Sequence, residues 1–182
     1  MTTMRPARAA AARYDSTSIL LHWLTAGLVA ALWTSGQTTD FWPRGTARTA
    51  YISVHVLLGM ALGAVILIRL AWRRTGGARI VPEGPALLAK AATGVHHLLY
   101  ALVVTTVTLG LLFASARGFQ LFGSIALPVV LADFKRTLGS WHGLAANAVV
   151  ILAGLHAAAA LGHHYLLRDG TLRRMLPVRR PG

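Results

Sequence analysis

Histidine is the residue type in this sequence best suited to chemistry. The chain holds eight histidines and no cysteine, which excludes disulfides, thiolate metal sites, iron–sulfur clusters and covalent cofactor attachment through cysteine. Any metal chemistry must therefore rest on imidazole nitrogen. Four of the histidines interrupt long apolar runs, namely His22, His55, His142 and His156. Polar side chains at membrane depth usually face other helices and serve a function.

The spacing of these four histidines predicts two pairs at different depths. His142 and His156 are 14 residues apart, which on a helix is about 21 Å of rise and only about 40° of rotation. One face of that helix can therefore present a histidine at each of two levels. With the orientation argued below, His22 pairs with His156 on the cytoplasmic side, and His55 pairs with His142 on the outer side.

Such pairs are suited to holding haem. Two imidazoles on facing helices, with a flat apolar macrocycle between them, fill both axial positions of a haem iron. A b-type haem held in this way has no open coordination position, so it suits electron transfer better than oxygen binding. We therefore predict two haems b that carry electrons across the membrane. The alternative for any single histidine is an interhelical hydrogen bond, but four histidines at matched depths favour haem.

The other four histidines lie nearer the cytoplasmic ends of the apolar runs. His163 continues the histidine face of the last run at a seven-residue interval, so we expect it to face the interior, either contacting a quinone or hydrated near the interface. His164 is turned about 100° away and is expected in solvent. His96 and His97 open the third run and are expected to serve packing or interfacial solvation.

Composition places these histidines in a membrane protein. The chain is 55% hydrophobic and 13% charged, with a mean hydropathy of +0.57, a balance that a water-exposed surface could hardly accommodate. A crossing needs about 20 apolar residues. We predict an all-α bundle of four transmembrane helices in one domain over residues 16–168. The spans are expected at about 18–36, 51–72, 91–116 and 141–167. Residues 117–139 are apolar but lack a full crossing length, so they are predicted to be a loop with an interfacial helix.

Lysine and arginine predict the orientation. Thirteen of the 18 lie in or beside a basic N-terminal tail (1–15), the loop after the second span and a basic C-terminal tail (169–182). The positive-inside rule therefore places both termini in the cytoplasm. The first tail is too interrupted by arginine to be a signal peptide. Topology thus explains the net charge of +13, and no nucleic-acid partner is expected.

Two stretches of the sequence resemble a known family. They are SWHGLAANAVVILAGLHAAAALGHHYLLRDGTLRRMLP, from Ser140 to Pro177, and RYDSTSILLHWL, from Arg13 to Leu24. Both closely resemble bacterial cytochrome b561, and within it the superoxide oxidase type. The resemblance covers nearly the whole chain after residue 12, while the basic start is longer than in the family. It implies a multi-pass protein of the bacterial inner membrane that binds two haems b. The implied iron ligands are His22, His55, His142 and His156.

The resemblance also implies a reaction. The members most similar to this sequence oxidise superoxide at the outer face and pass electrons through the haems to ubiquinone near the cytoplasmic face. His163 matches a quinone-contacting histidine of the family. The expected superoxide site is the group of basic residues around the outer histidine layer: Arg44, Arg48, Arg117, Lys135 and Arg136. Such a basic mouth concentrates a small anion, although the same cations could pair with haem propionates or lipid headgroups.

Two other classes of function are compatible with the sequence. One is a haem b electron-transfer subunit that docks to a dehydrogenase or hydrogenase partner and delivers its electrons to the quinone pool. The other is a four-helix membrane scaffold or transporter without a cofactor, which leaves the two histidine layers unexplained. A purified chain that is active alone would favour the superoxide oxidase, and co-purification of a redox protein would favour the subunit.

Overall fold

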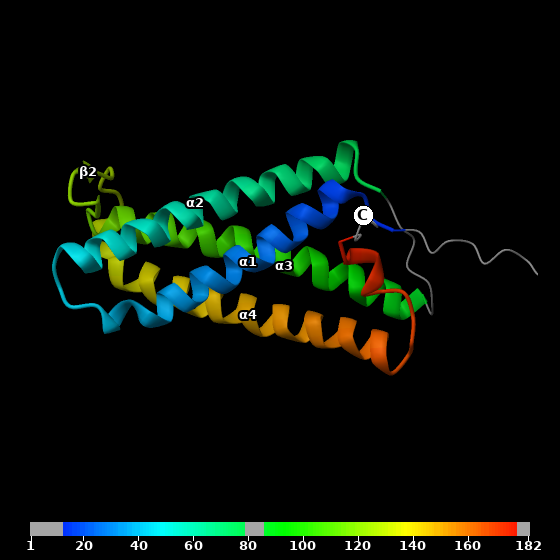
Figure 1. The fold of residues 1–182 in the computed structure, drawn as a ribbon. Helices are drawn as coiled ribbons and strands as arrows, with labels where there is room; N and C mark the ends of the chain where they lie inside the picture. Colours follow the sequence, from blue (N-terminus) through cyan, green and yellow to red (C-terminus); the bar gives the residue numbers. More distant parts are fainter. Residues whose placement is uncertain (1–12, 79–85, 178–182) are drawn as a thin grey trace, which may run out of the picture.

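The structure is a computed structural model that describes residues 13–78 and 86–177. Across these residues the chain forms four long helices in an up-down-up-down bundle (Figure 1). They are α1 (Ser16–Thr38), α2 (Thr46–Thr75), α3 (Ala86–Ala116) and α4 (Lys135–Tyr165). All four are long and apolar enough to cross a membrane. The prediction of an all-α membrane protein built on a four-helix bundle is therefore confirmed.

Short elements join the helices at the two ends of the bundle. Both described chain ends lie at the same end (Figure 1), which we call the cytoplasmic end. The η1 turn (Thr39–Phe41) follows α1 at the outer end, and the η3 turn (Arg173–Met175) folds back at the cytoplasmic end after α4. Most of the predicted N-terminal tail (1–12), the last five residues of the C-terminal tail and residues 79–85 lie outside the described part of the chain.

Asp15 caps α1 and ties it to the end of α2. Its carboxylate accepts hydrogen bonds from the backbone N–H and the hydroxyl of Ser18, at 2.8 and 2.7 Å. It also accepts from Trp72 Nε1 at 3.0 Å and from the backbone N–H of Ala78 at 3.1 Å. Partial burial by itself would raise the pKa of Asp15, but these hydrogen bonds lower the pKa well below its ordinary value. A side-chain oxygen before the first turn satisfies backbone N–H groups that the helix leaves open.

The segment between α3 and α4 differs from the prediction. The expected interfacial helix is wrong, because β1 (Gln120–Leu121) and β2 (Ile125–Ala126) form an antiparallel hairpin there. Gly118, Phe122 and Gly123 have positive φ angles of 60°, 52° and 73°, a conformation that a helix cannot contain. The hairpin is held against α2 because the Phe122 N–H donates to the fully buried hydroxyl of Ser53 at 2.8 Å.

The helices are also longer than the predicted spans. After the hairpin comes the η2 turn (Ala132–Phe134), and α4 begins directly after it at Lys135 rather than near residue 141. His142 therefore lies about two turns inside α4 instead of at its start. The outer histidine layer therefore lies inside the bundle rather than at its outer end.

Apolar side chains divide between a small core and a broad outer face. Leu62, Ile66, Val103 and Val149 form a buried cluster in the middle of the bundle. Many other large apolar side chains point outward, as Ile151 does with 66% of its surface exposed. A helix surface of this kind belongs in lipid, where apolar groups need no cover from other protein.

Candidate functional site

The inner histidine pair joins α1 to α4. His22 comes from α1 and His156 from α4, and their ring centres are 6.4 Å apart with planes at 66°. A metal–imidazole bond is about 2 Å long and the ring centre lies roughly 1 Å beyond the nitrogen, so two rings sharing one metal have centres roughly 6 Å apart. The observed separation agrees with this value.

The outer pair joins α2 to α4 with nearly the same separation. The ring centres of His55 and His142 are 6.2 Å apart, with planes at 83°. As the 14-residue spacing predicts, α4 contributes one ring to each layer. The two predicted pairs are therefore close neighbours in the structure, and their role as iron ligands stays a prediction.

Hydrogen bonds orient both outer rings for ligation. His142 Nδ1 lies 3.0 Å from the carbonyl oxygen of Thr106, which can only accept, so Nδ1 carries the proton. His55 Nδ1 lies 2.7 Å from the hydroxyl of Ser35, whose own proton goes to the Leu32 carbonyl at 2.8 Å. His55 therefore donates as well. Each ring keeps its Nε2 lone pair, which is the state that a metal-binding histidine needs.

A cavity of about 380 Å³ opens beside the outer pair. It is lined mainly by apolar side chains and by glycines from all four long helices. Those glycines are Gly36, Gly59, Gly110, Gly139 and Gly143. At Gly110 an added Cβ would lie 2.8 Å from Cε1 of His142, so only glycine lets the ring approach α3 this closely. The apolar, glycine-lined cavity and the two oriented imidazoles fit a haem.

The inner layer has a different surrounding. Arg69 of α2 donates from its guanidinium to Nδ1 of His22 at 2.9 Å. Because arginine cannot accept, the proton of a neutral His22 ring is then on Nε2, and it must move to Nδ1 before Nε2 can bind a metal. Arg69 also lies over the ring of Tyr100, at 5.5 Å from its centroid. His96 of α3 adds a third ring to this layer, 5.1 Å from His156.

His163 lies at the end of α4, with one ring nitrogen bound to an acid. Its Nδ1 is 2.6 Å from a carboxylate oxygen of Asp169. Partial burial would raise the pKa of Asp169, but hydrogen bonds from His163 and Thr171 outweigh it and lower the pKa to about 2. The carboxylate is therefore ionised throughout the physiological pH range.

The five predicted superoxide residues separate into groups. Arg117, Lys135 and Arg136 line one hollow of about 290 Å³ together with Phe113, and Arg117 lines the outer histidine cavity as well. Its guanidinium lies 5.3 Å from the centroid of the Phe113 ring. Arg44 is exposed and stands outside both hollows.

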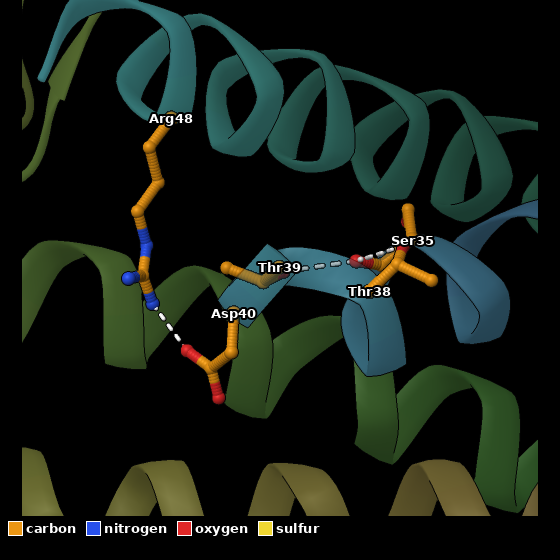
Figure 2. Close-up of polar contacts among 5 residues, drawn as sticks. All are labelled: Ser35, Thr38, Thr39, Asp40 and Arg48. Carbon is orange, nitrogen blue, oxygen red and sulfur yellow. Dashed lines mark hydrogen bonds and ion pairs between the residues drawn. The ribbon is translucent and has the colours of Figure 1, made fainter. Parts of the chain in front are cut away.

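Arg48 lies in the first turn of α2 and is paired with an acid. Its guanidinium forms an ion pair with Asp40 at 2.5 Å (Figure 2). In the same view, the turn after α1 is closed by the hydroxyls of Thr38 and Thr39, which both donate to the carbonyl of Ser35. The charge of Arg48 is thus largely compensated, whereas none of the three cations that line the hollow has an ion pair within the described residues.

Comparisons with known proteins agree with this architecture. The family model described as prokaryotic cytochrome b561 matches residues 13–178. The chain belongs to the prokaryotic cytochrome b561 family. It is therefore a haem b electron-transfer protein of the bacterial inner membrane, with several membrane crossings.

Individual relatives span nearly the whole chain. A protein named probable superoxide oxidase CybB from Yersinia pestis is 32% identical over 173 residues, covering 92% of this chain and 98% of its own. Cytochrome b561 homolog 1 of Escherichia coli K12 is 31% identical over 174 residues, covering 92% and 99%. Cytochrome b562 of Cereibacter sphaeroides is 32% identical over 176 residues, covering 91% and 96%.

Sequence reasoning missed several polar neighbours of the histidines in this cytochrome b561. Arg69 is one of the thirteen basic residues that predict the orientation, and its contact with His22 is not expected from the sequence. His96 is expected to serve packing or interfacial solvation, and the structure places its ring beside that of His156, a specific partner that the sequence did not indicate. Asp169 is one of only five acidic residues in the chain, and that scarcity was a signal that could have drawn attention to it.

Proposed function

We propose that this cytochrome b561 oxidises superoxide at its outer face and reduces ubiquinone near its cytoplasmic face, using two haems b. His22 and His156 would hold the inner haem, and His55 and His142 the outer one. The observation that carries the proposal is the separation of the paired rings, 6.4 Å and 6.2 Å, at two depths of one bundle. When bound, the two haems would pass single electrons, because their axial positions are filled.

The outer face supports the choice of an anionic substrate. Arg117, Lys135 and Arg136 gather in one hollow, where their field would attract a small anion and raise its association rate. Arg117 also lines the outer histidine cavity, so an anion drawn to the hollow would arrive beside the site of electron entry. Transfer of one electron from superoxide needs only close approach, and leaves dioxygen to diffuse away.

The cytoplasmic face supports quinone as the acceptor. His163 lies one heptad beyond His156 on the same face of α4, and its Nδ1 is occupied by Asp169. Its other ring nitrogen is available for a hydrogen bond to a quinone carbonyl. Both His163 and Asp169 keep 37% of their side-chain surface exposed, so a substrate in the membrane interface can reach the ring.

The test is reduction of the purified, haem-loaded protein by superoxide. Haem is quantified per chain, and a stopped-flow instrument then follows haem absorbance after mixing with superoxide, with and without a soluble ubiquinone analogue. We expect two low-spin b haems that are reduced by superoxide and reoxidised by the quinone. Superoxide dismutase in the mixture should abolish the reduction. If the haem-loaded protein consumes superoxide no faster than a haem-free preparation, the proposal is wrong.

A haem b subunit fed by a redox protein is the second candidate. It is favoured by apolar side chains that stand exposed on the outer loop, among them Phe122 with 52%, Ile125 with 62% and Val129 with 62% of their surface. A partner could cover such a surface. Two haems that remain oxidised in superoxide but become reduced by a co-purified dehydrogenase or hydrogenase would decide for this candidate.

A further inference from the structure

The end of α4 is built to bring one acid against one histidine. The helix ends at Tyr165, and Arg168 adopts a left-handed conformation with φ of 53°, which reverses the chain. The backbone N–H of Asp169 then donates to the carbonyl of His163 at 3.1 Å. The same turn carries the Asp169 carboxylate back onto Nδ1 of His163 at 2.6 Å. Two separate contacts thus fix the acid relative to the ring.

The Asp169 carboxylate is also fixed from its other side. Its second oxygen accepts the backbone N–H of Thr171 at 2.9 Å, so both oxygens are engaged. An ionised carboxylate can only accept, and therefore Nδ1 of His163 is the donor in their hydrogen bond. The remaining nitrogen, Nε2, is the position at which His163 can gain or lose a proton.

The turn is anchored to α1 rather than hanging from α4. Trp23 donates from Nε1 to the carbonyl of Met175 at 2.8 Å, and the backbone N–H of Tyr14 donates to the carbonyl of Arg174 at 3.3 Å. The segment after α4 therefore lies across the cytoplasmic end of α1, as the red turn in Figure 1 shows. The position of Asp169 depends on this docking.

We propose that Asp169 and His163 form a proton-delivering pair for the quinone, in which Asp169 positions the ring and His163 donates from Nε2. This inference rests on the proposed function, because it concerns the step at which quinone becomes quinol. Reducing one quinone takes two electrons, from two superoxide ions that leave as two dioxygen molecules, and two protons. For each proton, the Nε2–H bond of a His163 imidazolium breaks and an O–H bond forms on the quinone.

After each transfer His163 is neutral, with its Nδ1 proton still directed at Asp169. Cytoplasmic water then restores the Nε2 proton, which the partial exposure of both side chains allows. The Asp169 carboxylate meanwhile holds Nδ1 of the ring, so Nε2 stays on the side away from the acid. In this pair His163 is the general acid and the Asp169 carboxylate orients it, and general acid catalysis depends on such positioning of the donor.

The experiment separates haem reduction from haem reoxidation. In wild type, Asp169→Asn and Asp169→Glu, the haems are first reduced chemically without oxygen, and their reoxidation by a ubiquinone analogue is followed from pH 5 to pH 9. Superoxide-driven reduction is measured separately, in the absence of quinone. Asp133→Asn, which removes a carboxylate from the outer loop, is the matched control.

We expect Asp169→Asn to slow reoxidation at pH 7.5 by roughly 100-fold, the scale of general acid catalysis. The loss should persist across the pH range, because an amide at position 169 no longer holds Nδ1 of His163 through a charged hydrogen bond. Asp169→Glu should restore part of the rate, and reduction by superoxide should be unchanged in both Asp169 variants. In a His163→Gln background, Asp169→Asn should add nothing further.

Three outcomes would overturn the proposal. They are an Asp169→Asn profile that coincides with the wild-type profile, additive effects of the two substitutions, and wild-type haems that quinone does not reoxidise. Failure of superoxide to reduce the haems would instead refute the proposed electron donor, and chemical reduction keeps the quinone step measurable in that case. If Asp169→Asn lost its haem, Asp169→Glu and the His163→Gln pair would still decide the question.

Discussion

Gly110→Ala should remove the outer haem while leaving the inner one bound. An alanine Cβ at this position would lie 2.8 Å from Cε1 and 3.1 Å from Nδ1 of His142. Carbon atoms in contact are about 3.5 Å apart or more, so the His142 ring must retreat by at least about 0.7 Å. Metal–ligand distances tolerate only about 0.2 Å of change. The displacement is several times larger than the ligation geometry allows.

Helix stability does not account for the expected loss. Replacing glycine by alanine inside a helix is intrinsically favourable by roughly 0.5–1 kcal/mol, so α3 should fold at least as well. The retreat of His142 would also stretch its 3.0 Å hydrogen bond to the Thr106 carbonyl, which orients the ring. The effect should therefore be confined to the outer site.

The assay is haem content per chain by pyridine haemochrome, together with the reduced-minus-oxidised spectrum. Wild type should hold two haems per chain, and Gly110→Ala about one. Gly94→Ala is the matched control, because it lies in the same helix and its added Cβ would meet nothing within 4 Å. Two haems with unchanged spectra in Gly110→Ala would refute the reasoning, since the close approach of His142 would then serve no ligation.

Three further predictions follow from individual contacts. Asp15→Asn should lower the free energy of unfolding by about 1–2 kcal/mol in thermal unfolding at pH 7, because it weakens the cap of α1. The folded-state pKa of Asp15 is lowered, so its ionised carboxylate stabilises the fold fully above the ordinary value of 3.8 and loses this effect as the pH falls below it. The stability difference between variant and wild type should therefore shrink in acid. Arg117→Gln should slow haem reduction by superoxide several-fold at low ionic strength and less at high salt, whereas Arg44→Gln, outside the hollow, should change the rate much less. Ser35→Ala removes the hydrogen-bond acceptor of His55 and should weaken outer haem binding by roughly 10-fold to 100-fold in a titration of the haem-free protein, the usual cost of losing such a partner; unchanged binding would show that the His55 orientation does not depend on Ser35.

Much of the site follows from depth along the helices. Because each residue of a helix advances about 1.5 Å, the sequence positions of His22 and His156 were enough to predict one level and those of His55 and His142 another. The paired rings lie together in the structure at those levels. Depth does not predict rotation of a helix about its own axis, and this is why the third ring of the inner layer, His96, was not expected to touch His156.

Irregular segments escaped prediction for a different reason. Residues 117–139 are apolar, and apolarity alone suits an interfacial helix as well as a folded loop. Their conformation is decided by positive φ angles at Gly118, Phe122 and Gly123 and by a hydrogen bond to Ser53, 69 residues away in the sequence. A contact between such distant residues has no local pattern from which it could be predicted.

The sequence by itself determined the number of membrane helices, their orientation and the two histidine levels, because apolar length, basic flanks and helical rise act along the chain. Only the tertiary structure decided which polar groups meet those histidines: Arg69 at His22, Thr106 at His142 and Asp169 at His163. These contacts depend on how helices are rotated and how the segment after α4 folds back onto α1. They arise from packing between segments that are distant in the sequence. This packing gives each histidine a different polar partner, and therefore different chemistry.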